Sequence, residues 1–195
     1  VDDAIGTYTL MYTATDAAGN SATETRTVTV QAPPSGSDVI VFDDGVVDPI
    51  WDRGISAFDE AIGFGECNND GGAGCPSISW AVVDDSERGD VLQISHAAAG
   101  NLAGVFIAAN VPLDVSGFAN GSVVFDVKVV SGDSSITMKL DCVYPCTSGD
   151  QNLGSKGVAG WETVEVSFAQ LAAGGLNLTN VNTGLVIRAT NAPRT

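Results

Sequence analysis

Residues 121–141, Gly-Ser-Val-Val-Phe-Asp-Val-Lys-Val-Val-Ser-Gly-Asp-Ser-Ser-Ile-Thr-Met-Lys-Leu-Asp, hold two short apolar and β-branched runs on either side of a Ser-Gly-Asp-Ser turn. Such runs, bounded by turn residues, are typical of β-strands. The pattern recurs and predicts strands at residues 38–42, 78–84, 91–96, 104–109, 121–130, 135–141, 163–167 and 183–188. Only residues 168–173 suggest a helical turn. We therefore expect an all-β fold, a jelly-roll β-sandwich.

A β-hairpin is predicted before this sandwich. Residues 7–14 alternate, so that Tyr8, Leu10 and Tyr12 share one face, and residues 22–30 form a second strand after a turn. The run from Gly6 to Asn20, with its Tyr…Asp-x-x-Gly-Asn pattern, resembles the last two strands of a bacterial immunoglobulin-like domain. The resemblance implies a fragment of a spacer domain.

These patterns divide the chain into three parts. Residues 1–31 are predicted to be the C-terminal hairpin of the immunoglobulin-like spacer domain, and the Pro/Gly/Ser-rich residues 32–37 a linker. Residues 38–195 are predicted to form the jelly roll, which we expect to lack its closing strand. We also expect the chain to begin partway along a longer or processed protein, because no basic and apolar leader precedes the first strand.

The charge of the chain limits its partners. The 195 residues include 24 Asp and Glu against 8 Lys and Arg, a formal net charge of −16. Nucleic acid and anionic membrane surfaces are excluded as partners, since the long-range field repels them. The longest uncharged stretch, residues 97–113, is too short and too interrupted to span a membrane. Two explanations of the carboxylates stay open, structural calcium and a surface that only keeps the protein soluble.

The four cysteines form two close pairs in sequence, Cys67 with Cys75 and Cys142 with Cys146. Neither pair has zinc-ligand spacing, which favours disulfides and an oxidising, extracellular compartment. Pairing within each loop is favoured, and pairing between the two loops is the alternative.

Tryptophans are the first candidates for ligand binding. Trp51 lies in a polar loop beside Asp52, where an exposed indole could stack on a sugar while the carboxylate bonds its hydroxyls. The alternative is that Trp51 closes the end of the sandwich. Trp80 could face either the core or a ligand, and Trp161 is predicted to lie in the core.

The second cysteine loop offers another binding surface. Tyr144 sits between Cys142 and Cys146, and Lys139, Asp141 and Gln151 flank the loop. A stiffened loop presents its side chains at a lower entropic cost on binding. Tyr144 is therefore predicted to stack on a sugar, with the flanking residues bonding its hydroxyls.

Metal binding and catalysis have weaker signals. Asp70, in an Asn-x-Asp-Gly run of the first cysteine loop, and Asp43 are the candidate calcium ligands, without the ligand spacing of an EF-hand. No serine-hydrolase, metalloprotease or phosphate-loop motif is present, and the lone His96 is predicted to be structural. We expect no catalysis.

Several motifs together resemble one known module: residues 51–59, 66–71, 84–96 and 160–164, and the Cys-Val-Tyr-Pro-Cys loop at 142–146. They are similar to the C-terminal jelly-roll domain of marine bacterial exo-β-glucanases of glycoside hydrolase family 3 and of related laminarin-degrading enzymes. The resemblance implies a non-catalytic β-sandwich related to carbohydrate-binding modules, with a structural calcium. The closing strand of those domains, which carries an Asp-Asn pair, is not found before Thr195.

The sequence thus predicts a secreted, non-catalytic carbohydrate-binding module that holds a β-glucan of the laminarin type. The alternative is a structural unit of an extracellular adhesin or filament, assembled by strand addition with a neighbouring partner.

Overall fold

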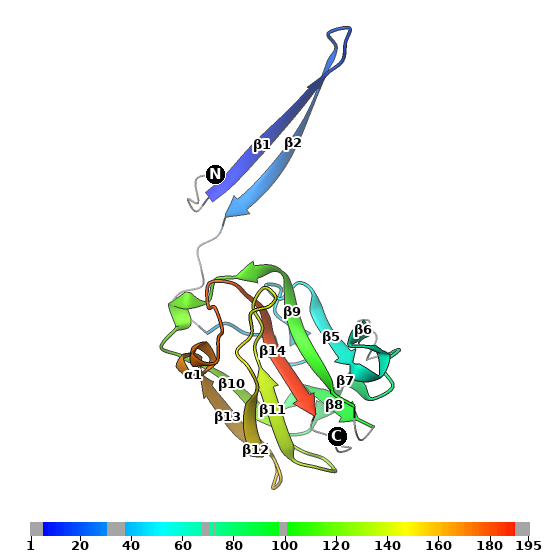
Figure 1. Ribbon diagram of the computed structural model, residues 1–195, viewed down its shortest axis with the longest axis vertical. Coiled ribbons are helices and arrows are strands. Elements are labelled where there is room, and N and C mark those ends of the chain that lie inside the picture. Colours follow the sequence, from blue (N-terminus) through cyan, green and yellow to red (C-terminus); the bar gives the residue numbers. More distant parts are fainter. Residues whose placement is uncertain (1–5, 31–37, 68–70, 72, 98–100, 190–195) are drawn as a thin grey trace.

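A computed structural model describes residues 6–30, 38–67, 71, 73–97 and 101–189. The predicted linker at 32–37 and the candidate ligand Asp70 lie outside these residues. The all-β prediction is confirmed: the chain forms antiparallel sheets with one short α-helix (Figure 1).

The larger layer is a six-stranded antiparallel sheet. Its strands follow the order β12 (Gln151–Ser155), β11 (Ser135–Lys139), β14 (Val181–Ala189), β9 (Ala103–Leu113), β5 (Gly54–Asp59) and β6 (Gly65–Cys67). Figure 1 shows these strands side by side, with β14 and β9 in the middle.

The opposite layer consists of two separate strand pairs. β7 (Ile78–Asp85) pairs with β8 (Gly89–His96), and β10 (Ser122–Val127) pairs with β13 (Glu162–Ser167). The stretch 121–141 is therefore divided, since β10 lies in this layer and β11 in the six-stranded sheet. A further small ladder pairs β3 (Phe42–Asp43) with β4 (Val46–Val47).

Three short helical segments join the strands. These are the 3₁₀ turns η1 (Glu60–Ile62) and η2 (Ser116–Phe118) and the helix α1 (Phe168–Ala173). The predicted turn at 168–173 is thus confirmed, and the hydroxyl of Ser167 caps α1 by accepting from the backbone N–H of Gln170.

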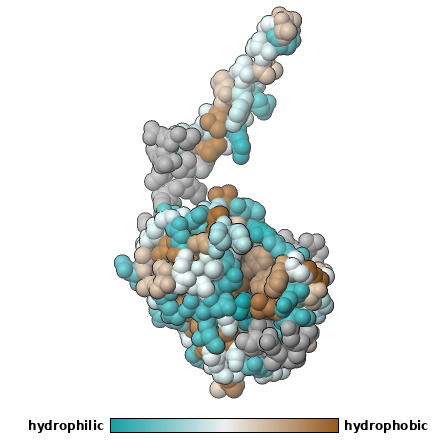
Figure 2. Space-filling model, in the orientation of Figure 1, coloured by the Kyte–Doolittle hydropathy of each residue, from teal (hydrophilic) through white to brown (hydrophobic). Residues whose placement is uncertain are grey.

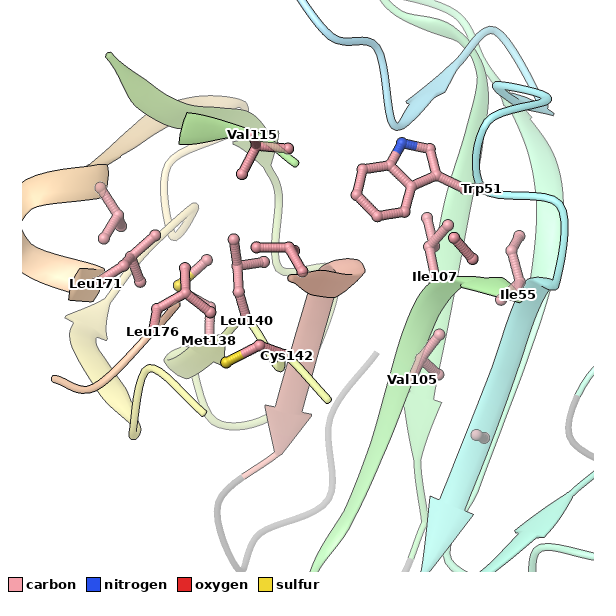
Figure 3. Packing of buried hydrophobic residues seen from close by; sticks show 14 of the residues in the cluster. Trp51, Ile55, Val105, Ile107, Val115, Met138, Leu140, Cys142, Leu171 and Leu176 are labelled. Atoms are coloured by element: carbon pink, nitrogen blue, oxygen red, sulfur yellow. The ribbon is translucent and has the colours of Figure 1, made fainter. Parts of the chain in front are cut away.

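Side chains from both layers fill one hydrophobic core. Ile107 and Met138 come from the six-stranded sheet and Leu171 from α1, and each is buried (Figure 3). Val164 of β13 belongs to the same buried cluster. Burial of this apolar surface is the main force that holds the two layers together.

One predicted strand is almost absent, and three strands of the six-stranded sheet, β5, β6 and β12, are not predicted by the sequence pattern. Residues 38–42 hold almost no strand, because only Phe42 enters the two-residue β3. β5 was not predicted, since Gly54, Ser56 and Asp59 interrupt its apolar residues. It nevertheless pairs with β9 and β6 inside the six-stranded sheet, and its consecutive residues Ile55, Ser56 and Ala57 are buried.

The N-terminal hairpin is confirmed. β1 (Gly6–Thr15) and β2 (Ser21–Val30) pair in register over their whole length. Asp16 closes the turn, where its carboxylate accepts from the backbone N–H groups of Ala18 and Asn20, each at 2.9 Å. Within the described residues, no other strand joins this hairpin.

The cysteines pair locally, Cys67 with Cys75 and Cys142 with Cys146. The strand register places the two disulfides at opposite ends of the six-stranded sheet. Cys67 pairs with Ala57, which lies opposite Val105 near the start of β9, whereas Cys142 bridges to Val181, which lies opposite Leu113 at the end of β9. Pairing between the loops is therefore wrong. No helix in the described part of the chain is long and apolar enough to cross a membrane.

Candidate functional site

One end of the sandwich gathers most of the predicted binding residues. We call it the loop end, defined as residues 48–53, 110–114, 140–150 and 177–182. The N–H of Arg53 donates to the carbonyl of Ala108 at 3.1 Å, and Val181 pairs with Leu113. These backbone links join loops that are far apart in the sequence.

Tyr144 is the most exposed aromatic residue of the loop end, with 93% of its surface accessible. Its loop is held by the Cys142–Cys146 disulfide and by the N–H of Val143, which donates to the carbonyl of Asn180 at 3.2 Å. The Tyr144–Pro145 peptide bond is cis. The ring is thus presented to solvent on a loop anchored to β14, as predicted.

The polar residues predicted beside Tyr144 lie at the base of the same loop. The ammonium of Lys139 is 2.7 Å from a carboxylate oxygen of Asp141, and both side chains are partly exposed. Gln151 donates to the carbonyl of Ser148 at 3.3 Å and accepts from the side-chain amide of Gln170 at 2.6 Å. Lys139 and Asp141 therefore offer both a donor and an acceptor to a ligand.

Asp52 lines a shallow groove on the loop end. The groove has a volume of about 400 Å³ and is bordered by Pro49, Ile50, Asp52, Val111 and Leu113. The backbone N–H of Asn110 donates to Asp52 at 2.8 Å, and this bond, followed by the Asn110 side chain, lowers the pKa of the carboxyl. Asp52 is consequently an ionised acceptor at neutral pH.

The prediction that Trp51 is exposed for sugar stacking is wrong. Its accessible surface is only 3%, and its indole N–H donates to the carbonyl of Ile40 at 3.1 Å. A Cβ at position 184 would lie 2.8 Å from the indole, so Gly184 lets the ring lie against β14. Trp51 closes the end of the core, which was the alternative (Figure 3).

The other two tryptophans lie in the opposite layer, away from Tyr144. Trp80 on β7 is partly buried and packs against the core, and its indole N–H finds no partner among the described residues. The prediction that Trp161 is a core residue is wrong. Its ring is flanked by Arg88 at 5.9 Å and Lys128 at 5.1 Å, and its N–H donates to Asp85 at 3.1 Å.

The remaining predictions concern His96 and calcium. His96 is buried opposite Ile78 in the β7–β8 ladder, as expected of a structural residue. Asp43 is exposed on β3, and among the described residues no three metal-binding side chains come together. Calcium binding at Asp43 and Asp70 stays a prediction.

Sequence reasoning missed the apolar wall of the groove. Ile50 and Val111 are exposed hydrophobic residues separated by 61 positions, and only the fold brings them together. In the sequence, each of them is marked only by a neighbouring proline. Pro49 precedes Ile50 in a loop, and Pro112 follows Val111 near the end of β9.

Comparison with known families agrees with this architecture. Residues 70–194 match the Exop_C family, described as galactose-binding domain-like, and residues 2–30 match the Ig-like domain of bacterial surface proteins. No curated protein matches the sequence.

Two solved structures are similar. An exo-1,3/1,4-β-glucanase from a Pseudoalteromonas species aligns with a TM-score of 0.56 and 12% identity, over 90% of this chain and 22% of that one. Carbohydrate-binding modules of the β-sandwich superfamily align with a TM-score of 0.44 and 13% identity, over 98% of this chain and 72% of that one.

The identity to the glucanase is low, so this likeness shows the fold alone, and the chain spans about a fifth of that enzyme's length. The family match covers well over half of the chain and includes every described strand from β7 to β14. On that match, the chain belongs to the Exop_C family of galactose-binding domain-like modules.

Proposed function

We propose that this protein is a non-catalytic carbohydrate-binding module of a secreted bacterial polysaccharide-degrading protein, and that it binds β-glucan of the laminarin type at the loop end. The observation that carries the proposal is Tyr144, a 93% exposed aromatic residue on a disulfide-anchored loop. The apolar face of a sugar ring stacks on an aromatic ring, and a side chain already held in place loses little entropy on binding.

The surroundings of Tyr144 suit a neutral, hydroxyl-rich ligand. Lys139 donates and Asp141 accepts, and these two charges cancel. The groove with Asp52 adds a further acceptor beside apolar walls. A polyanionic glycan would meet the repulsion of a chain with a net charge of −16.

The choice of β-glucan is supported by the similar structure, which belongs to an enzyme described as an exo-1,3/1,4-β-glucanase. A module of this kind raises the effective concentration of an attached catalytic domain at its substrate. Secretion is supported by the two disulfides and by the match to bacterial surface proteins.

Affinity electrophoresis of the 195-residue chain tests the proposal. Gels containing laminarin, mixed-linkage β-glucan, alginate or no polysaccharide are run side by side, with sugar release assayed in parallel. We expect retardation by a neutral β-glucan without hydrolysis, and loss of most of that retardation in Tyr144→Ala.

The matched control is Tyr12→Ala, which removes an exposed tyrosine from the hairpin, where 54% of the residue's surface is accessible. It should migrate like the parent protein. No retardation in any gel, with calcium present, would contradict glycan binding and favour the alternative of an adhesin or filament unit assembled by strand addition.

A further inference from the structure

The outer face of the six-stranded sheet carries a second, smaller hydrophobic cluster. Phe106, Ala108 and Val186 are buried there, and Phe58 packs against them while staying partly exposed. The strand register shows that Phe58 on β5 and Val186 on β14 belong to the same face, on either side of β9. This face points away from the main core, and none of the four residues belongs to the loop end.

Phe58 rests directly on the backbone of β9. A Cβ added at Gly104 would lie 2.7 Å from a ring carbon of Phe58 and 2.9 Å from the carbonyl oxygen of Ile187. Only glycine therefore allows the ring to approach the strand so closely. One side of the ring is in contact with the sheet, and its partial exposure is toward solvent.

Three ion pairs surround this ring and its neighbours. Lys139 pairs with Asp141 as described, Arg53 pairs with Glu66, and Arg188 lies 2.6 Å from Asp150. The guanidinium of Arg53 also stands 5.5 Å from the centre of the Phe106 ring. Three of the eight Lys and Arg residues of the chain lie on this face, and each forms an ion pair with a carboxylate.

The face is thus formally neutral on a strongly acidic protein. Its paired charges can donate hydrogen bonds to the hydroxyl groups of a sugar and accept hydrogen bonds from them. Because the charges are balanced, the face attracts neither anions nor cations by its net charge. Figure 2 shows both hydrophobic and hydrophilic residues on the visible face of the globular part.

We propose that this face is a second glycan-binding surface, on which an internal stretch of a neutral glucan chain lies across the strands. Phe58 supplies the stacking ring, and the three ion pairs bond the hydroxyls on either side. From Glu66 on β6 to Lys139 on β11 the face crosses four strand spacings, about 19 Å, which is longer than a single sugar ring. The inference rests on the glycan binding proposed above and adds a second stacking ring, Phe58. The two surfaces meet at the Lys139–Asp141 pair, which also lies at the base of the Tyr144 loop.

Isothermal titration calorimetry with laminarin and with a laminari-disaccharide separates the two sites. Phe58→Leu keeps an apolar side chain on Gly104 but removes the aromatic ring. We expect it to weaken binding of the polymer about tenfold and to leave disaccharide binding unchanged. Tyr144→Ala should weaken binding of both ligands, and the double variant Phe58→Leu/Tyr144→Ala should no longer bind the polymer.

Phe125→Leu is the matched control, because Phe125 is a partly buried residue of β10 in the opposite layer. It should bind both ligands like the parent. If Phe58→Leu fails to fold, as judged by circular dichroism, the paired variant Glu66→Gln/Asp150→Asn replaces it and should weaken polymer binding several-fold.

The outcomes distinguish the two proposals. Binding of the polymer by the parent, with no change in the face variants, overturns the second surface and leaves the loop end as the binding site; the face would then be free for contact with a protein. Failure of the parent to bind either ligand overturns glycan binding itself, and the second surface with it.

Discussion

At the scale of single residues, burial separates side chains that are alike in sequence. Trp51 and Tyr144 are both aromatic residues in loops at the same end of the sandwich, yet one is 3% and the other 93% accessible. Trp51 finds a carbonyl acceptor on Ile40 and space above Gly184, whereas Tyr144 stands on a loop that the Cys142–Cys146 disulfide closes. The first residue supports the core and the second is available to a ligand.

Trp51→Ala should therefore act on stability. Removing a buried tryptophan leaves a cavity and an unpaired carbonyl, and we expect a loss of about 3–5 kcal/mol in the free energy of unfolding. Urea unfolding followed by circular dichroism measures it. Tyr144→Ala, as the exposed counterpart, should change the free energy by no more than about 0.5 kcal/mol. Equal urea midpoints for Trp51→Ala and the parent would show that Trp51 does not support the core.

At the scale of secondary-structure elements, the opposite layer needs a link other than a backbone ladder. The described strands β7–β8 and β10–β13 form two separate sheets. Charged side chains connect them, since Lys128 after β10 lies 2.5 Å from Asp85 at the end of β7, and Arg88 lies 3.2 Å from Asp126 on β10. Trp161 packs between the two cations.

The stabilising effect of the charged contacts between the two strand pairs depends on pH through Asp85. The ammonium of Lys128, followed by the backbone N–H of Glu87 and the indole of Trp161, lowers the pKa of Asp85 to about 2. In the unfolded chain an aspartate titrates near pH ~4. The carboxylate therefore stabilises the fold fully above about pH 4, and this contribution is lost as the pH falls toward about 2.

Asp85→Asn tests this link. The variant should melt at a lower temperature than the parent at neutral pH, and the difference should shrink between about pH 4 and about pH 2, as measured by thermal unfolding at several pH values. Asp84→Asn is the control, because Asp84 is a neighbour on the same strand and faces Asp90 rather than a cation. A melting difference for Asp85→Asn that stays constant over this acid range would contradict the role of its charge.

At the scale of the whole molecule, most of the few Lys and Arg side chains form ion pairs within the fold. Six of the eight Lys and Arg residues, all those between Arg53 and Arg188, form ion pairs with carboxylates. Asp59 is buried, and most of the other described Asp and Glu residues outside these pairs are exposed. The long-range field is thus negative, while the candidate binding surfaces carry balanced pairs of charges.

This distribution predicts how ionic strength affects binding. Affinity for a neutral β-glucan should change less than about twofold between roughly 50 and 500 mM sodium chloride, because no counterions are released. Alginate, a polyanion, should not bind at low salt, where repulsion is strongest. Titration calorimetry at both salt concentrations checks this. A steep fall of glucan affinity with salt would show that unpaired charges make the contact.

Much of the candidate site around Tyr144 could be predicted from the sequence, because its parts are close along the chain. Lys139, Asp141 and Gln151 flank the same cysteine loop, so local geometry brings them to its base. The groove could not be predicted, since Ile50 and Val111 meet only through the pairing of β5 with β9. The same holds for Phe58, whose ring depends on Gly104 of a neighbouring strand.

The sequence by itself determined what short-range forces decide: the strands of alternating or β-branched residues, the turn closed by Asp16, and the start of α1 at its Ser167 cap. Only the tertiary structure decided that residues 121–141 divide between two layers, that β5 is a central strand, and that Trp51 is buried. These outcomes depend on which distant strands become neighbours. A pattern within one segment cannot specify them, because burial is a property of the assembled layers.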